Sequence, residues 1–414
     1  MKRLFIFLLT VICGSAQAQL SDPAYATWDG HFSVGTYGRY QLATNALTSN
    51  FVWNLYQGKN LSRDLRNKVS NKLGKSNRLG ADLDYGLFAK HFPDSTSRAG
   101  IGWFMKIASR THVNTKFPKD LFDISMFGNA MFAGKTADLS NIELRFMSYK
   151  QFEIGILKNI TKKKGTWNLG LGVSLLMGNR NLNFSVDKAE LFTEENGEYL
   201  EGEIQGSIRT SSLSASQYFD SNGIGFSTSL NVGYQSKKFG FLFQVADLGM
   251  ISWSKQLTRT ELDSSFLFEG VELDLFPSDG VSFSSINLDT VVAGFASKRT
   301  PSKYSMATPA TFRLEGFYAL NSKKWKLYAG VQYRIASAYV PYVYVGTSSP
   351  LPKGFFIDGR MAYGGFGSWN IGLEIRKKFA EVLEIRLGTN NLEGYVLPMV
   401  GTSQGAYLGI TGFF

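Results

Sequence analysis

The side chains that could carry chemistry are charged residues two positions apart in otherwise apolar, alternating stretches. Glu374 and Arg376 precede a predicted turn over 377–380, and Glu384 and Arg386 follow it. With that turn centred near residue 380, Arg376 faces Glu384 and Glu374 faces Arg386 across two antiparallel strands. Such pairs predict either ion-pair ladders that close an interior or a charged lining that selects solutes. Because positive and negative charges are equal in number here, ion-pair ladders are favoured over a charged lining.

Two further groups of charged residues have the same balanced character. Arg313, Glu315 and Arg334 lie on either side of a predicted turn over 321–324 and predict a second cluster. Arg145 and Glu153 are spaced for a third. We expect all of these side chains to point into one interior, because alternate residues of a strand share a face.

Catalytic chemistry has little support in the sequence. The histidines are His31, His91 and His112, and none lies in a Ser/His/Asp, H-E-x-x-H or nucleophile-elbow setting. Gly170-Leu171-Gly172 lies within a predicted strand and not at a strand–helix phosphate loop. We therefore expect no enzyme, cofactor or metal site, with a membrane-embedded hydrolase as the remaining catalytic alternative.

Long alternating strands must hold the charged residues. Between Trp167 and Gly178, large apolar residues occupy one face, and Gly, Ser and Asn residues mostly occupy the other. The same alternation recurs over 223–235, 325–335 and 369–375. A soluble β-sandwich also alternates, but its polar face is a wet surface rich in Lys, Glu and Thr. Small polar residues suit a crowded interior, so we predict an all-β fold, a closed transmembrane antiparallel β-barrel with short helices in long loops or the lumen.

The connections between strands predict an even number of strands. Short and long connections alternate, as they do in outer-membrane barrels. Long connections are predicted over 41–78, 111–137, 179–221, 254–308, 347–365 and 391–401. One strand over 138–160, followed by an outer excursion, gives 12 strands, whereas a hairpin over 138–160 and a separate strand over 204–218 give 14.

Both ends of the chain indicate export to a bacterial outer membrane. Lys2-Arg3, the apolar run over 4–13 and Ala16-Gln17-Ala18 predict a signal peptide over 1–18, cleaved between Ala18 and Gln19. A lipoprotein processed at Cys13 is the alternative, which Ile12 disfavours because a small residue is needed there. The alternating stretch Gly405–Phe414 ends on an aromatic residue, which is typical of the assembly signal of outer-membrane barrels. We therefore expect residues 19–414 to form one barrel domain that meets the barrel-assembly machinery through Phe414.

The distribution of charge along the chain limits which classes of binding partner we expect. The formal net charge is +11, but much of the basic charge lies in short turns and no groove-reading motif is present, so we expect no nucleic acid. Acidic residues gather in 179–221 and 254–308, where solvated outer loops are favoured over a divalent-cation site. The expected partners are outer-membrane lipid and other envelope proteins.

One segment outside the signal peptide predicts a helix. Over 59–75, apolar residues recur every fourth position and Gly74 is placed as a C-cap; the apolar positions are Leu61, Leu65, Val69 and Leu73. The segment is strongly basic, so it could lie at an anionic membrane surface, plug the barrel mouth or remain a solvated loop helix. The apolar stretch over 120–133 could cover or enter the lumen.

Four stretches carry a resemblance to a known family: Pro118–Lys135, Asp247–Trp253, Thr308–Phe312 and Gly405–Phe414. On these the chain resembles a family of uncharacterised outer-membrane β-barrels of Bacteroidota-type bacteria, defined as a domain of unknown function. The resemblance implies an outer-membrane barrel over nearly the whole mature chain and transfers no functional residue. More distantly, the architecture is similar to long-chain fatty-acid channels and to barrel subunits of type IX secretion.

Two functions from different classes remain open at the level of sequence. The first is a transport or channel-type barrel for small or hydrophobic solutes with a partly occluded lumen. The second is a non-conducting envelope scaffold, or a secretion-associated barrel that binds protein partners. Balanced charges without a constriction of one sign argue against a wide general porin.

Overall fold

The structure is a computed structural model that describes residues 32–92, 100–211, 221–255, 257–268, 303–320, 325–380 and 382–414, and the backbone of 296–300. The predicted signal peptide over 1–18, including Cys13, and the predicted first mature residue Gln19 lie outside the described residues, as does His31. So do the acidic residues of 269–295.

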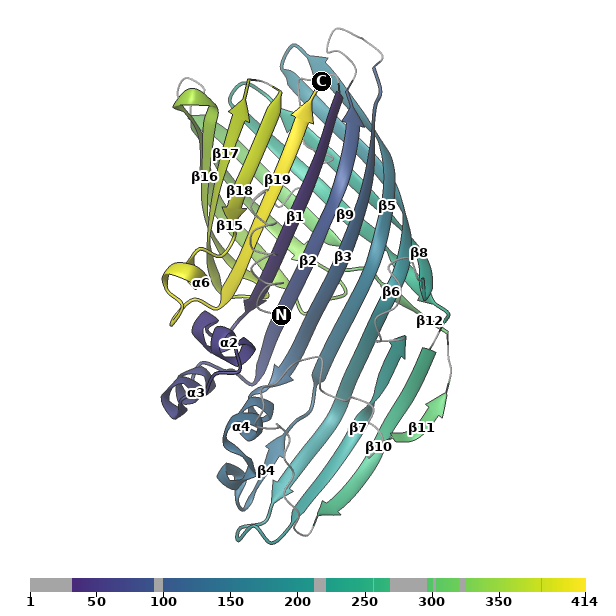
Figure 1. Ribbon diagram of the computed structural model, residues 1–414, viewed down its shortest axis with the longest axis vertical. Coiled ribbons are helices and arrows are strands. Elements are labelled where there is room, and N and C mark those ends of the chain that lie inside the picture. Colours follow the sequence, from purple (N-terminus) through teal and green to yellow (C-terminus); the bar gives the residue numbers. More distant parts are fainter. Residues whose placement is uncertain are drawn as a thin grey trace.

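Fourteen antiparallel strands close into a barrel, as Figure 1 shows. The barrel strands are β1 (Phe32–Thr44), β2 (Ser76–His91), β3 (Gly102–Pro118), β5 (Ile142–Lys162), β6 (Gly165–Thr193), β8 (Gly223–Gln235), β9 (Phe239–Trp253), β13 (Thr311–Leu320), β14 (Trp325–Arg334), β15 (Val340–Leu351), β16 (Phe355–Gly365), β17 (Trp369–Phe379), β18 (Leu383–Thr389) and β19 (Ser403–Phe413). The last strand pairs with the first, from Ser33 opposite Phe413 to Ala43 opposite Ser403. This pairing of the first and last strands closes the barrel, which is what a lipid environment requires.

The barrel has 14 strands, but they are not the strands from which the sequence predicted this number. Residues 142–162 form one strand and not a hairpin. Of the predicted strand over 204–218, residues 204–211 pair outside the barrel, and residues 212–218 lie outside the described residues. The predicted loop over 347–365 is wrong, because it contains the end of β15 and all of β16, joined by the short helix η3 (Pro352–Gly354). In the sequence, the spacing of Pro350, Pro352 and Gly354 is typical of a long loop. Only Pro352 and Gly354 belong to the turn, because Pro350 lies in β15.

The outer surface of the barrel is apolar, as the strand alternation predicts. Exposed side chains of the four predicted stripes include Leu171, Phe226, Leu327 and Ile375. Aromatic residues bound this belt on β14, where Trp325 and Tyr333 are both exposed. At about 3.3 Å per residue and a tilt of about 40°, the distance between these two residues corresponds to roughly 20 Å along the barrel axis. That height suits the hydrocarbon layer of an outer membrane.

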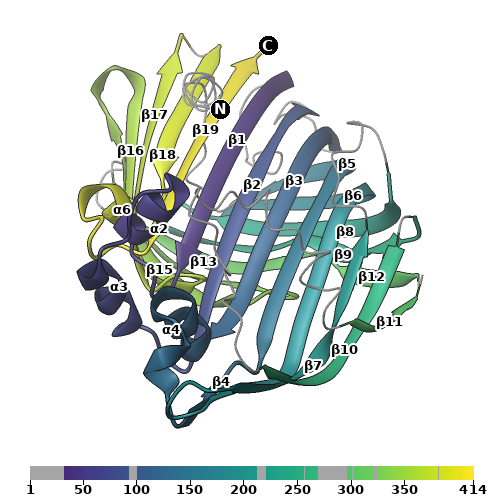
Figure 2. The same ribbon diagram turned by 60° about the horizontal axis from the view of Figure 1, so that its bottom comes forward.

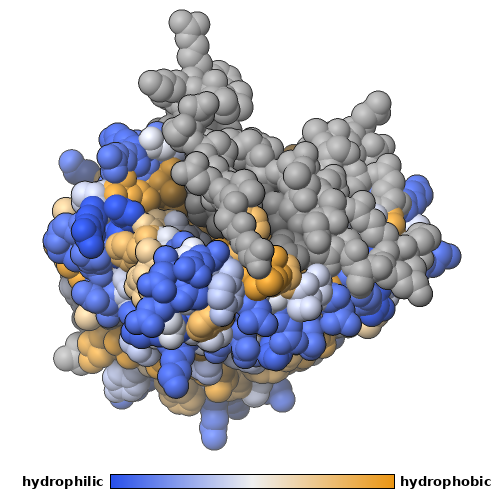
Figure 3. All heavy atoms as spheres, turned by 90° about the horizontal axis from the view of Figure 1, so that it is seen from below, coloured by the Kyte–Doolittle hydropathy of each residue, from blue (hydrophilic) through white to orange (hydrophobic). Residues whose placement is uncertain are grey.

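The two ends of the barrel differ. The end with Phe32 and Phe413 carries short connections, such as the two residues between β5 and β6. The opposite end, at the bottom of Figure 1, carries the long connections with their helices and extra strands. Seen from this end, hydrophilic side chains prevail on the described surface (Figure 3). By the usual polarity of outer-membrane barrels, the long connections face the cell exterior.

A sheet extends beyond the barrel at the long-connection end, and we call it the wing. β6 has 29 residues, and its second half pairs with β7 (Leu200–Ser211) and β4 (Lys135–Asp138). β7 pairs with β10 (Leu257–Phe268), which pairs with β11 (Ala296–Thr300). A shorter strand, β12 (Tyr304–Ala307), continues β13 along β9. The excursions at 179–221 and 254–308 are thus partly built of strands.

The predicted helix over 59–75 forms as α3 (Arg63–Ser70), with the hydroxyl of Ser62 as its N-cap. Its apolar residues Leu65 and Val69 are buried against α2 (Ser49–Tyr56) and α4 (Lys119–Phe127), together with Leu73, while Leu61 packs at the edge of this cluster. Figure 2 shows these helices together on one side of the rim. In this conformation α3 lies at the rim and packs against α2 and α4, and its role as a plug or as a membrane-surface helix stays a prediction. None of the helices in the described ranges is long and apolar enough to cross a bilayer.

A short helix, α6 (Glu393–Val396), stands where β18 stops. β18 pairs with β17 only as far as Thr389 opposite Leu373. Beyond it, the N–H of Leu392 donates to the carbonyl oxygen of Ile371 (2.8 Å), and the N–H of Ile371 donates to Oε2 of Glu393 (2.8 Å). The α6 connection thus satisfies the strand edge that β18 leaves open.

Glu393 makes this attachment sensitive to pH. Burial raises the pKa of its carboxyl from 4.5 to about 7, although the hydrogen bond from Ile371 opposes the shift. The Glu393 carboxyl therefore binds its proton more tightly when the loop is attached than when it is detached. The attachment is strongest below about pH 4.5 and weakens as pH rises to about 7.

We expect hydrogen exchange of the Ile371 amide, corrected for its intrinsic pH dependence, to become faster across this pH range. Glu393→Gln keeps an acceptor for Ile371 but cannot ionise, so its exchange profile should be flat. The same slope in both proteins would contradict this assignment to Glu393.

Candidate functional site: the charged lumen

Charged residues on β2 and β3 enter the lumen because they alternate with residues that face lipid. Asp82 and Asp84 are buried, whereas Leu83 between them is exposed on the outer face. On β3, the inward residues include Arg110 and His112. Register places Asp82 opposite His112 and Asp84 opposite Arg110, so each carboxylate faces a basic side chain on the neighbouring strand.

One charged bridge crosses the lumen from β3 to β9. Nη1 of Arg110 lies 2.5 Å from Oδ2 of Asp247, and both side chains are buried. Nε2 of Gln151 donates to the other oxygen of Asp247 over 2.7 Å. On the near wall, Asp84 lies 3.8 Å from Arg110 and 2.9 Å from Nη2 of Arg39. The carboxylate of Asp247 is therefore held from two strands of the opposite wall.

The backbone of Asp247 is shaped to aim its side chain inward. Its φ is 61°, in the left-handed region that few non-glycine residues adopt. The β8–β9 register shifts at the same level, between Thr228 and Leu230, which marks a β-bulge. The Asp247 N–H donates to Oγ of Ser229 over 3.2 Å. Bulges re-aim side chains, and here the result is a carboxylate directed across the barrel.

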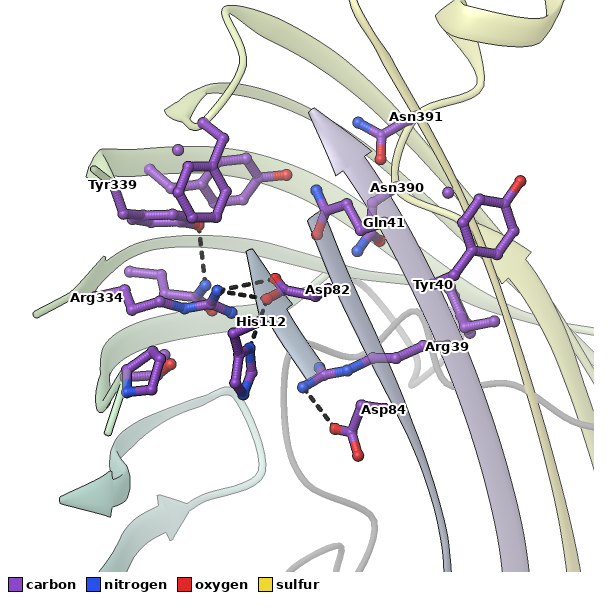
Figure 4. A pocket seen from close by; sticks show the side chains of 18 of the residues that line it. Arg39, Tyr40, Gln41, Asp82, Asp84, His112, Arg334, Tyr339, Asn390 and Asn391 are labelled. Carbon is purple, nitrogen blue, oxygen red and sulfur yellow. Dashed lines mark hydrogen bonds and ion pairs between the residues drawn. The ribbon is translucent and has the colours of Figure 1, made fainter. Parts of the chain in front are cut away.

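A second bridge crosses from β2 to β14. Nη1 of Arg334 lies 3.0 and 2.8 Å from the two oxygens of Asp82. Nδ1 of His112 lies 2.6 Å from Oδ1 of the same carboxylate. Figure 4 shows Asp82 between Arg334 and His112, with Arg39 bonded to Asp84 on the same side of β1. The two bridges together tie three parts of the wall: β2–β3, β9 and β14.

The Asp82–His112 pair resembles part of a hydrolytic triad, but its third member is unsuitable. The group at Nε2 of His112 is the hydroxyl of Tyr149 at 3.4 Å, and Tyr149 is buried. A hydrolytic triad needs an activated Ser, Cys or Thr at that nitrogen. In the part of the chain that the structure describes, no group of His, Cys, Asp and Glu side chains is arranged to hold a metal ion. The arrangement can therefore bind and orient charge.

A third ion pair lies between β3 and β5. Nζ of Lys106 lies 2.5 Å from Oε2 of Glu153, and neither side chain is exposed to solvent. The predicted partner of Glu153, Arg145, instead lies 3.8 Å from Glu143 of its own strand. Arg145 and Glu153 lie eight positions apart on the continuous strand β5, with Arg145 opposite Asn114 and Glu153 opposite Lys106, so the expected Arg145–Glu153 group does not form.

The charged cluster predicted from Arg313, Glu315 and Arg334 forms only in part. Arg313 pairs with Glu315 on the same strand, and both bond to the hydroxyl of Tyr344, over 2.9 and 2.8 Å. Arg334 belongs instead to the bridge to Asp82. The sequence could place Arg334 on the inner face but could not show which side of the barrel its guanidinium would reach.

The ladder predicted for the β17–β18 hairpin has the wrong register. Arg376 lies opposite Arg386, because the pairing of Phe379 with Leu383 centres the turn one residue later than expected. Opposite charges meet along each strand: Nε of Arg376 lies 3.1 Å from Glu374, and Arg386 pairs with Glu384. All four charged side chains nevertheless point inward, with Glu374 and Glu384 buried.

Little space remains between these side chains. The cavity in Figure 4, lined by Asp82, Arg110, His112, Gln244 and Arg334 among others, has a volume of about 90 Å³. A second cavity of about 190 Å³ shares His112 and is lined by Asn114, Asn183 and Arg209. An apolar cavity of about 150 Å³ can stay dry and bind benzene. The first cavity is smaller than that and the second is larger, but both have polar linings that would hold water.

The comparisons with known proteins place the chain in a family. A family model matches residues 23–383. The chain belongs to the Family of unknown function (DUF5723). No curated protein matches this DUF5723 chain in sequence.

Solved structures with a similar barrel include outer-membrane channels. A mutant of TodX, described as a monoaromatic hydrocarbon channel, is 8% identical over 97% of this chain and 96% of its own, with a TM-score of 0.45. A Pseudomonas aeruginosa FadL homologue is 10% identical over 95% and 92%, with a TM-score of 0.40. The translocator domain of autotransporter NalP from Neisseria meningitidis is 8% identical over 100% and 96%, with a TM-score of 0.36. Because each TM-score is below 0.5, these likenesses do not bear on what this DUF5723 chain carries.

Two of the stretches that suggested the family meet at the β-bulge of Asp247. Asp247–Trp253 lies on β9, and Thr308–Phe312 leads into β13 beside it, with Thr311 opposite Ala246. Oγ1 of Thr308 donates to the carbonyl oxygens of Asp247 (2.5 Å) and Gly249 (3.0 Å). In this DUF5723 chain the two stretches therefore fix the residue that anchors the first bridge.

Sequence reasoning missed the centre of the lumen. Arg39, Asp82, Asp84, Lys106 and Arg110 were not singled out, and Asp247 was noted only for the family resemblance. One available signal was the spacing of Asp82 and Asp84 around exposed Leu83, which puts two carboxylates on an inner face. Nothing in the local pattern shows that Asp247 departs from regular strand geometry.

Proposed function

We propose that this chain is an outer-membrane channel for small polar solutes, held closed in the described conformation by ion pairs that cross its lumen. The observation that carries the proposal is the pair of bridges Arg110–Asp247 and Arg334–Asp82, each joining walls that are not neighbours in the sheet. Solute passage requires these bridges to part.

We further propose that the signal peptide is cleaved near Ala18 and that Phe414 engages the assembly machinery.

The lining favours polar over hydrophobic solutes. The residues around the Figure 4 cavity include carboxylates, guanidinium groups and amides such as Gln244 and Gln332. An apolar solute moving past them would strip their hydration without replacing it, which is unfavourable. A small polar solute can exchange hydrogen bonds with the same groups.

The test is swelling of liposomes that contain the folded protein, in glycine or in a trisaccharide. Wild type should admit glycine slowly and exclude the trisaccharide. The double variant D82A·R334A removes one bridge and should speed glycine entry several-fold. A matched control is K188A·E203A, which removes an ion pair of the wing (2.7 Å) and should leave entry unchanged. No entry through wild type or D82A·R334A would refute the channel.

A second candidate function is a non-conducting envelope scaffold, and the wing is the observation that favours it. A strand of 29 residues with paired β7 and β10 projects well beyond the barrel, as Figure 1 shows. Such a sheet offers a surface to another envelope protein. A lumen that stays closed in every variant, with binding lost when the wing is deleted, would support this candidate.

A further inference from the structure

The connection that contains α6 exposes a continuous apolar surface. Residues 395–400 read Tyr-Val-Leu-Pro-Met-Val, and all are exposed, with Val396 at 65% and Met399 at 62%. Water-facing loops rarely keep so many large apolar residues uncovered, and a contiguous exposed patch indicates a binding or membrane surface.

This apolar run lies outside the barrel wall, at the outer edge of the lipid-facing belt. Its base is fixed on Ile371 of β17 by Leu392 and Glu393. Ile371 is two residues along β17 from Trp369, which lies opposite exposed Tyr363. The hydroxyl of Tyr395 bonds to that of Tyr40 on β1. Tyr40 alternates with inward Arg39, and Figure 4 shows the two side chains on different sides of the strand.

Helix α2 extends the same surface. The N–H of Ser49 donates to the carbonyl oxygen of Gly401 (2.7 Å), and that of Asn50 to Pro398 (2.9 Å). Trp53 and Tyr56 of α2 are both exposed, and their rings stack at 6.1 Å. We call Trp53, Tyr56 and residues 395–400 the apolar shelf. Its aromatic content is typical of side chains at a membrane interface.

Basic residues follow the shelf toward the cell exterior. Exposed Lys and Arg residues on and beside α3 are Lys59, Arg63, Lys68, Lys72 and Lys75. The acidic residue in this segment is Asp64, which pairs with Lys68 over 2.8 Å. Figure 1 shows α6, α2 and α3 one below another, from the barrel wall toward the long-connection end, and Figure 2 shows them on the same side of the rim. The order is apolar, then aromatic, then basic.

We propose that the apolar shelf is embedded in the outer leaflet and that the basic side chains of α3 bind phosphate groups of anionic lipids there. The order of the three surfaces matches acyl chains, interface and phosphate headgroups. Continuity with the lipid-facing belt selects lipid over a protein partner as the occupant. The inference rests on the outer surface and does not depend on whether the lumen conducts.

Spin-label depth measurements test the embedding. In the full chain with Cys13→Ser, a label at Val396→Cys is compared with one on the lipid-facing belt, at Leu387→Cys, and one at the tip of the wing, at Asn196→Cys. In lipid vesicles, the Val396 label should be accessible to oxygen and shielded from an aqueous nickel complex, as at Leu387. Accessibility like that at Asn196 would overturn the embedding and indicate a water-facing surface for another protein.

A lipid-retention measurement tests the phosphate contacts. The protein is extracted from vesicles of mixed phosphatidylcholine and phosphatidylglycerol, and the retained lipids are quantified by mass spectrometry. Each Lys or Arg near an anionic membrane surface strengthens the binding of anionic lipid by about fivefold. K72E·K75E should therefore lower the retained ratio of phosphatidylglycerol to phosphatidylcholine by about tenfold or more. The matched control K163E·K164E changes the same charge in an exposed turn at the opposite end and should leave the ratio unchanged. An equal fall in both variants, or in neither, would refute the site on α3.

Discussion

Replacing Asp247 with alanine should lower the free energy of unfolding by about 3 kcal/mol or more, because it leaves the Arg110 guanidinium buried without its closest carboxylate. Arg110 keeps Asp84, but at 3.8 Å and shared with Arg39. Urea titration of the barrel in lipid vesicles, followed by tryptophan fluorescence, measures the change. Comparing Asp247→Asn with Asp247→Ala separates the effect of the lost charge from the effect of backbone strain, because asparagine tolerates the left-handed conformation and alanine does not.

The double variant R110A·D247A distinguishes a coupled pair from two independent sites. Removing both charges leaves no unpaired ion, so the double variant should be more stable than the sum of the single effects predicts, by about 2 kcal/mol. If the two costs simply add, Arg110 and Asp247 do not hold one another, and the first bridge is not an energetic unit.

Glu153→Ala should have a comparable effect, again about 3–5 kcal/mol, since its partner Lys106 is fully buried. The same urea titration measures it. The control is Glu203→Ala in the wing, which breaks a Lys–Glu pair of similar length whose side chains are well exposed. Water solvates the remaining charge there, so the free energy of unfolding should hardly change. Equal losses at both positions would mean that burial in the lumen adds nothing to the pair.

The barrel could be predicted from the sequence because it depends on short-range patterns. Alternation with period two, as from Trp167 to Gly178, specifies which residues face lipid and which face the lumen. The basic helix α3 follows equally from apolar residues at every fourth position and from Ser62 at its start. These features depend on neighbours within one element.

Partners inside the lumen could not be predicted, because they depend on register and on barrel curvature. Centring the β17–β18 turn one residue too early moved each expected partner by two positions, so Arg376 lies opposite Arg386. Arg334 reaches Asp82 across the barrel, and no local pattern encodes that distance. The left-handed conformation of Asp247 depends on Thr308 and Ser229, which lie far from it in sequence.

The bridges have a consequence for function beyond stability. Buried ion pairs contribute little net stability relative to apolar packing, because desolvating the charges is costly. We propose that their arrangement across the lumen has another effect, which is to close it against solutes. Charged groups, unlike an apolar plug, can rehydrate when they separate, so under this proposal the same residues line the open path.

Single-channel recording in planar bilayers tests the central claim most directly. Wild-type protein should be closed for most of the recording, and R110A·D247A should show frequent stepwise openings under the same conditions, with K188A·E203A indistinguishable from wild type. Steady, large currents through wild type that R110A·D247A does not increase would show that the bridges do not close the lumen.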